Sequence, residues 1–87
     1  MRKVAFLPDA FEQLNFWMRE DRKISKRIAD LIRDIDRDPF NGIGKVEPLR
    51  GNLAGLWSRR ITEEHRLVYS VSEDEILIYS CRFHYSR

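Results

Sequence analysis

The spacing of apolar residues changes once along the chain, and this change constrains the fold more than any other feature. Up to residue 38, apolar residues recur every three or four positions, the period of an amphipathic helix. From residue 56 onward, apolar and polar residues alternate, the period of a half-buried strand. Residues 39–55 between them are rich in glycine and proline, which indicates a loop. The pattern therefore predicts an α+β domain, with helices first and most of a sheet after them.

A short strand and two helices are predicted before the loop. Residues 3–7 form an apolar run that predicts an N-terminal strand, and Pro8 suits the first turn of a helix that ends near Glu20. Asp21 is a plausible N-cap for a second helix. Asp38-Pro39 ends that helix, because a residue before proline disfavours the helical conformation. The second helix carries an apolar stripe consisting of Ile24, Ile28, Leu31, Ile32 and Ile35.

Three strands are predicted after the loop, at residues 56–61, 65–71 and 75–85, joined by short polar turns. We expect the two helices to pack on one face of a twisted antiparallel β-sheet. The richer apolar sets should face the helices, namely Leu67, Tyr69 and Val71, and Leu77, Tyr79, Cys81, Phe83 and Tyr85. The opposite face then holds Arg66, Arg82 and His84, on the side that the glycine- and proline-rich loop could cover.

Composition narrows the class of protein. At 87 residues we expect one domain spanning residues 1–87. One cysteine cannot form an internal disulfide, and with two histidines it cannot supply an ordinary four-ligand zinc site, so we expect a cytoplasmic protein without metal or other cofactor. Asp34, Asp36 and Asp38 are spaced by two and splay around a helix, which argues against a metal site. No apolar run approaches the ~20 residues of a membrane span, and no signal peptide is expected.

The open sheet face suits one chemistry, the metal-free cleavage of RNA. This reaction needs a base for the ribose 2′-OH, a cation for the charge on the phosphorane, and an acid for the leaving 5′-oxygen. A carboxylate or histidine can be the base, arginine the fork-shaped clamp, and histidine or another donor the acid. The candidates are Arg66, Arg82 and His84 on the face, Arg59 or Arg60 beside them, and Lys45, Glu47 and Arg50 in the loop.

Each candidate also has a structural interpretation. Glu47 can be a solvated loop carboxylate, Arg66 a strand-edge residue, and His84 a surface histidine. His65 lies beside a turn on the apolar side of its strand, so we interpret it as structural. Tyr85 is equally a packing aromatic or a stacking partner. The net charge of +2 permits nucleic-acid binding without arguing for it.

A long stretch nevertheless resembles a known family. Residues 45–69 read KVEPLRGNLAGLWSRRITEEHRLVY, and this run resembles the YoeB (Txe) toxins of the RelE superfamily, as do Asp38-Pro39-Phe40, Gly42-Ile43-Gly44 and Cys81-Arg82-Phe83-His84-Tyr85. The resemblance implies a RelE-like fold similar to microbial ribonucleases. It also implies a toxin that cleaves mRNA in the ribosomal A site and tends to dimerise. A YefM-type antitoxin would neutralise it through a disordered segment, and the complex would bind operator DNA.

By position, the resemblance implies roles for individual residues. Glu47 matches the general base, Arg66 the phosphate-stabilising arginine, His84 the general acid, and Tyr85 an aromatic that shapes the site. RNA contacts are implied for Lys45, for Arg50, which stands where a lysine is common, and for Arg60. The chain departs from the family in continuing past the His-Tyr pair with Ser86-Arg87, which puts any role of a Tyr85 carboxylate in doubt.

Residue pattern and resemblance together predict a metal-independent, ribosome-dependent mRNA endoribonuclease, with the choice of base between Glu47 and His84 left open. One alternative is an interaction module that binds antitoxin and DNA after its catalysis has decayed. Another is a sequence-tolerant RNA-binding domain. The low net charge argues against this last class, because phosphate contacts demand a stronger basic surface.

Overall fold

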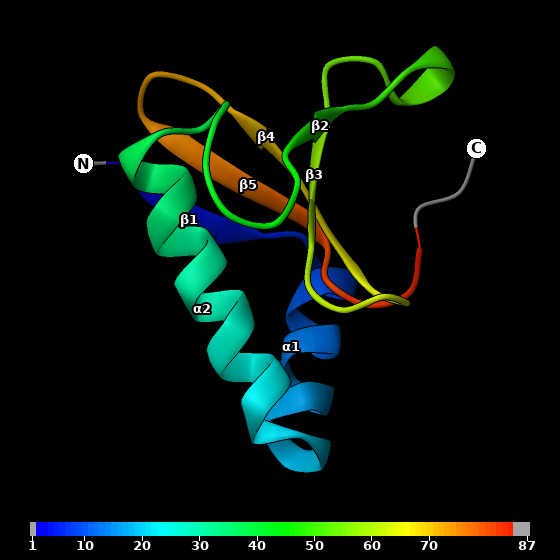
Figure 1. Ribbon diagram of the computed structural model, residues 1–87. Coiled ribbons are helices and arrows are strands. Elements are labelled where there is room, and N and C mark those ends of the chain that lie inside the picture. The colour runs from blue at the N-terminus through cyan, green and yellow to red at the C-terminus, as the bar shows by residue number, and fades with distance from the viewer. Residues whose placement is uncertain (1, 85–87) are drawn as a thin grey trace.

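Two helices and a five-stranded sheet form the two layers of the computed structural model, which describes residues 2–84 (Figure 1). In chain order the elements are β1 (Lys3–Phe6), α1 (Pro8–Glu20), α2 (Arg22–Arg37), β2 (Glu47–Pro48), the 3-10 helix η1 (Gly51–Leu53), β3 (Trp57–Arg60), β4 (Arg66–Val71) and β5 (Glu75–Ser80). No helix in this described part of the chain is long and apolar enough to cross a membrane.

Local residue chemistry sets the ends of both helices, as predicted. Pro8 opens α1, where its fixed φ fits and its missing N–H would have no partner anyway. The Asp21 carboxylate caps α2 by accepting hydrogen bonds from the N–H groups of Lys23 and Ile24, at 3.1 and 3.4 Å. The helix ends at Arg37, directly before Asp38-Pro39.

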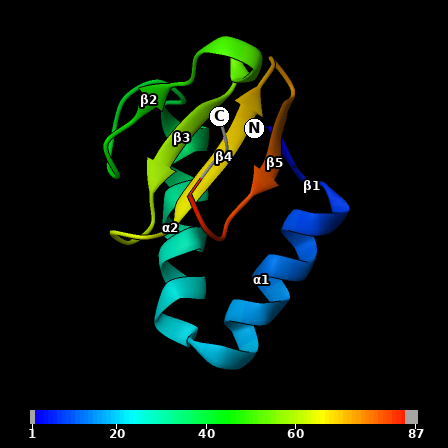
Figure 2. The same ribbon diagram turned by 90° about the vertical axis from the view of Figure 1, so that its right-hand side faces the viewer.

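The sheet is mixed, with strand order β1-β5-β4-β3-β2. The three predicted C-terminal strands form the antiparallel meander, and β1 joins its far edge by pairing parallel with β5. β2 was not predicted, because it is a strand of two residues within the loop. In Figure 2 the viewer looks onto the sheet with α2 behind it, while the chain after β5 turns back in front of β4.

The core lies between the helices and one face of the sheet. Its β4 residues, Leu67 and Tyr69 with Val71 packed beside them, face the helices as predicted. On β5 the prediction was wrong: Ile76 and Ile78 are fully buried in the core, in place of their neighbour Leu77. The helices contribute Ala10, Trp17, Ile28, Leu31 and Ile35 to the same cluster.

A β-bulge explains why the prediction failed on this strand. The register with β4 passes from Tyr69↔Ile78 to Val68↔Ser80, so Tyr79 is an extra residue on β5. An extra residue inverts the alternation beyond it. Cys81 therefore returns to the core, as predicted, where burial raises the pKa of its thiol to about 12.

The last predicted strand is too long, because β5 ends at Ser80 and not at residue 85. We call residues 81–84 the C-terminal segment. Its backbone bonds to helix α1: the Cys81 N–H donates to Gln13 Oε1 at 2.7 Å, and Trp17 Nε1 donates to the Cys81 carbonyl at 2.9 Å. These bonds replace the strand ladder and carry the segment away from the sheet. Phe83, predicted to face the helices, is 54% exposed.

Arg59 is the polar centre of the core and holds the start of the loop. Its side chain is fully buried and forms an ion pair with Asp34 of α2. Its Nε donates to Tyr69 Oη at 3.2 Å. The remaining donors bind the carbonyls of Asp38, Asn41 and Ile43. Arg59 therefore faces the helices, and of the two arginines considered only Arg60 projects from the opposite face of the sheet.

Candidate active site

Strand register gathers several of the predicted site residues on the sheet face that points away from the helices. Cross-strand partners place Glu47, Ser58, Val68 and Ser80 in one row. Arg60 and Arg66 are partners in the next row. Side chains of residues paired across antiparallel strands project from the same face. Glu47, Arg60 and Arg66 thus share one surface, which we call the open face.

A pocket of about 370 Å³ adjoins this row of residues. Val68 and Ser80 of the sheet line it, together with Leu53 of the loop, Leu56 just after the loop and His84 of the C-terminal segment. The loop therefore covers part of the open face, as the sequence suggested. His84, which is exposed, is brought to the same side of the sheet as Arg66.

Arg66 is held in one orientation by the turn between β3 and β4. The residue is only 8% exposed, and its Nη1 donates to three backbone carbonyls, those of Thr62 at 2.8 Å, Glu63 at 3.0 Å and His65 at 3.2 Å. Within residues 2–84, its Nε and Nη2 have no hydrogen-bond partner. The guanidinium is thus fixed through one nitrogen and keeps two donors for an oxyanion.

The backbone next to His84 is also fixed. The Phe83 N–H donates to His65 Nδ1 at 2.7 Å, and the Arg66 N–H donates to the Phe83 carbonyl at 3.0 Å. Phe83 has φ of +66°, a left-handed conformation that a bulky residue adopts only when its surroundings enforce it. The His65 ring packs edge-on against Trp17, with centroids 4.8 Å apart, so His65 is built into the fold, as the sequence predicted. We call Gln13, Trp17 and His65 the His84 anchor.

Buried polar atoms without partners concentrate at this face. Of the side chains in the described part of the molecule, Ser58 Oγ, Arg60 Nε and Arg82 Nε are buried and have no hydrogen-bond partner. Ser58 and Arg60 lie on the open face, and Arg82 lines its pocket. Buried polar groups are nearly always paired, so this clustering favours a face that a polar ligand completes.

Arg82 itself departs from the prediction. Its guanidinium lies 3.6 Å from the centroid of the Phe16 ring and so stacks on α1, where it is not directed across the sheet beside Arg66. Cation–π stacking of this kind is worth about 0.5–2 kcal/mol. Arg82 thus adds to the contacts that tie the C-terminal segment to the first helix.

The remaining predicted residues lie at the edge of the site or beyond the described residues. Lys45 and Arg50 are exposed on either side of β2. The Arg60 N–H donates to the Gly44 carbonyl, which places Lys45 beside the end of β3. Tyr85, like the Ser86-Arg87 extension, lies outside the described residues.

Three acidic residues near the end of α2 bind separate partners. The Asp34 carboxylate accepts hydrogen bonds from Arg59, Arg37 and the Ile43 N–H. Burial raises the pKa of this carboxyl, but the three hydrogen bonds outweigh burial and lower it to about 2. Asp36 pairs with Arg2, and Asp38 accepts from the Phe40 N–H. Across residues 2–84, no three His, Cys, Asp or Glu side chains converge as metal ligands would.

Comparison with known proteins gives consistent matches over the whole chain. The family described as YoeB-like toxin of bacterial type II toxin-antitoxin system matches residues 6–85. Toxin YoeB of Mycobacterium bovis is 56% identical over 85 residues, which cover 98% of this chain and 100% of that relative.

Solved structures agree with this match. A YoeB dimer from Staphylococcus aureus has a TM-score of 0.92 at 46% identity, covering 97% of this chain and 98% of that one. A YoeB-YefM complex from the same organism has a TM-score of 0.90 at 44% identity, covering 98% of this chain and 99% of that one.

Proposed function

Because this chain belongs to the YoeB-like toxins of bacterial type II toxin-antitoxin systems, we propose that it cleaves mRNA on the ribosome with the open face as its active site. The observation that carries this proposal is the geometry of Arg66, which is fixed through Nη1 and keeps Nε and Nη2 without partners in residues 2–84. A planar pair of donors matches two oxygens of a phosphate.

In the proposed reaction, Glu47 removes the proton from the ribose 2′-OH, and the resulting oxygen attacks the adjacent phosphorus. Arg66 neutralises the charge that develops on the phosphorane. His84 gives a proton to the leaving 5′-oxygen as the P–O bond breaks. The products are a 2′,3′-cyclic phosphate and a 5′-OH. The exposure of Glu47 supports access to substrate, and the His84 anchor supports a defined position for the acid.

The remaining site residues are proposed to bind RNA. Lys45, Arg50 and Arg60 would contact the backbone around the cut, and Tyr85 would stack on or shape the site. The chain has a formal net charge of only +2, too low for strong binding to free RNA. The low charge supports a substrate that the ribosome presents, and we propose a cytoplasmic location for the enzyme.

Solved structures of a relative support the proposed protein partners. The Staphylococcus aureus relative is solved both as a dimer and in complex with YefM. We accordingly propose that this chain forms a homodimer, binds a YefM-like antitoxin and reaches operator DNA only within that complex.

Cleavage should not need a metal ion, because the proposed base, cation and acid are all side chains. We expect unchanged cleavage in a cell-free translation reaction when 1,10-phenanthroline removes transition metals and leaves the magnesium that ribosomes require. The new 5′ ends should accept phosphate from polynucleotide kinase without phosphatase treatment. Ends that already carry a 5′-phosphate would contradict the mechanism, whatever the response to the chelator.

The His84 anchor gives a second prediction. His65→Leu removes the acceptor for the Phe83 N–H and leaves an apolar side chain to pack against Trp17. This variant should lower kcat about 10- to 100-fold, the scale expected for a misplaced catalytic group. His65→Asn should stay near wild type, because its Oδ1 can replace Nδ1 as acceptor.

Single-turnover cleavage at several ribosome concentrations separates kcat from KM in both variants, and thermal melts report stability. A purely structural role would give equal activity per folded molecule in the two variants and would overturn this prediction.

A further inference from the structure

Helix α1 carries a second apolar stripe, of which only Leu14 packs against the core. Leu7, Phe11, Leu14 and Met18 are spaced by four, three and four, which places them along one side of the helix and its N-cap. Phe11 and Met18 are 51% and 53% exposed, and Leu7 is 36% exposed. A helix with only one buried face would carry polar residues here.

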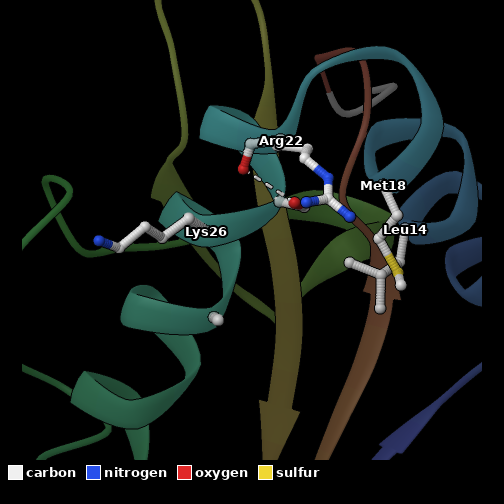
Figure 3. A pocket seen from close by; sticks show the side chains of 6 residues that line it. Leu14, Met18, Arg22 and Lys26 are labelled. Atoms are coloured by element: carbon white, nitrogen blue, oxygen red, sulfur yellow. Dashed lines mark hydrogen bonds between the residues drawn. The ribbon is translucent and has the colours of Figure 1, made fainter.

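The stripe borders a groove between the two helices. Two adjoining pockets of about 490 and 320 Å³ share Leu14, Ser25 and Ala29, and together form what we call the helix groove. Figure 3 shows one end, with Arg22 of α2 reaching toward Leu14 and Met18 of α1. The other end is lined by Val4 and Phe6 of the edge strand β1 and by Ile32.

The charged residues that line the groove are all basic. Arg22, Lys26 and Arg33 lie along α2, and no acidic residue lines either pocket. Arg33 pairs with Asp30 at 3.0 Å. In the described part of the chain, Arg22 and Lys26 have no ion-pair partner. A second copy bound here would bring these cations toward their own counterparts, so charge complementarity favours an acidic occupant.

We propose that the helix groove binds an acidic amphipathic helix of about three turns, supplied by the antitoxin partner. Apolar residues at i, i+3/i+4 and i+7 would pack on Leu14, Met18 and Ala29, and carboxylates would face Arg22 and Lys26. The identity of the partner rests on the proposed function. The location does not, since the groove lies on the helical side of the sheet, away from Arg66.

The groove and the open face therefore have separable roles. An antitoxin segment bound in the groove leaves Arg66 uncovered, so this contact contributes affinity, while a different segment must block catalysis. Joining two such contacts on one chain raises the overall affinity through effective concentration.

Titration calorimetry with the antitoxin encoded beside this toxin tests the proposal. Arg22→Glu and Lys26→Glu should each weaken antitoxin binding about tenfold, with less loss at high salt. Lys23→Glu is the matched control, because it makes the same charge change on α2 at an exposed residue outside the groove. It should bind within about twofold of wild type.

Equal weakening by all three substitutions, or by none, would overturn the groove proposal. Met18→Ser tests the apolar part and should weaken binding without the salt dependence. Ribosome-dependent cleavage by the free toxin, assayed in parallel, reports on the proposed function separately. If the groove variants bind antitoxin as the wild type does and the free toxin cleaves mRNA, only the groove proposal is refuted. If the free toxin does not cleave mRNA, only the proposed function is refuted.

Discussion

Arg66→Ala should lower ribosome-dependent mRNA cleavage by about 10²–10³-fold, the usual cost of removing one group that stabilises a developing oxyanion. The loss should be in kcat, because the phosphorane charge exists only in the transition state. Arg66→Lys should remain strongly impaired, since lysine keeps the charge but cannot present two planar donors while a third nitrogen holds the turn.

The measurement is primer extension on an mRNA in a cell-free translation reaction, with and without ribosomes. Circular dichroism and antitoxin binding establish that each variant is folded, which matters because Arg66 also bonds the turn at Thr62 and Glu63. Cuts that persist in a folded Arg66→Ala variant would remove Arg66 from the mechanism. A folded wild type without any cuts would favour the binding-module alternative.

Arg59, on the adjacent strand β3, should matter for stability. Arg59→Ala should lower the free energy of unfolding by about 3–5 kcal/mol, the cost of breaking a buried ion pair by removing one partner. It leaves Asp34 without its buried cation and strips hydrogen bonds from the carbonyls of residues 38, 41 and 43.

Arg60→Ala is the matched control, on the same strand but the opposite face. It should change stability by less than about 1 kcal/mol, because its ion pair with Glu63 is exposed. Urea unfolding at neutral pH measures both variants. If Arg59→Ala proves too unstable to purify, Arg59→Lys should be intermediate. Equal stability of the Arg59 and Arg60 variants would contradict the buried network.

The same network gives stability a defined pH dependence. The pKa of Asp34 is lowered from 3.8 to about 2 in the folded chain, so the folded state binds its proton less readily than the unfolded state does. This contribution is complete above about pH 4 and is lost as the pH falls toward 2. An Asp34→Asn variant should show a shallower loss of stability across that acidic range.

The parts of the fold that the sequence predicted well depend on local chemistry. Pro8, Asp21 and Pro39 set helix ends through their own backbone and cap preferences, and these preferences are visible in the local sequence. The errors involve relations between distant segments. The bulge at Tyr79 exists only because β5 pairs with β4 out of step, and β2 is visible only when β3 lies beside it.

The candidate site likewise combines features that the local sequence predicts with features that depend on distant segments. Alternation along β4 was enough to place Arg66 opposite the core, and the residue roles assigned by resemblance remain predictions. The choice between Arg59 and Arg60 required the exact parity of β3, which a strand start one residue away would reverse. Gln13 was missed entirely, because its bond to Cys81 spans 68 residues and leaves no local pattern.

The long reach of that bond has a consequence for how the toxin is made. β1 and α1 are synthesised first, yet β1 pairs with β5, and Gln13 and Trp17 hold Cys81. A nascent chain that has not yet exposed residues 75–84 can form neither pairing. The backbone bond from Arg66 to Phe83 must form just as late, so the proposed site of Arg66 and His84 is incomplete while the chain is being made. If the proposed function holds, the emerging toxin leaves its own message uncut until synthesis has ended.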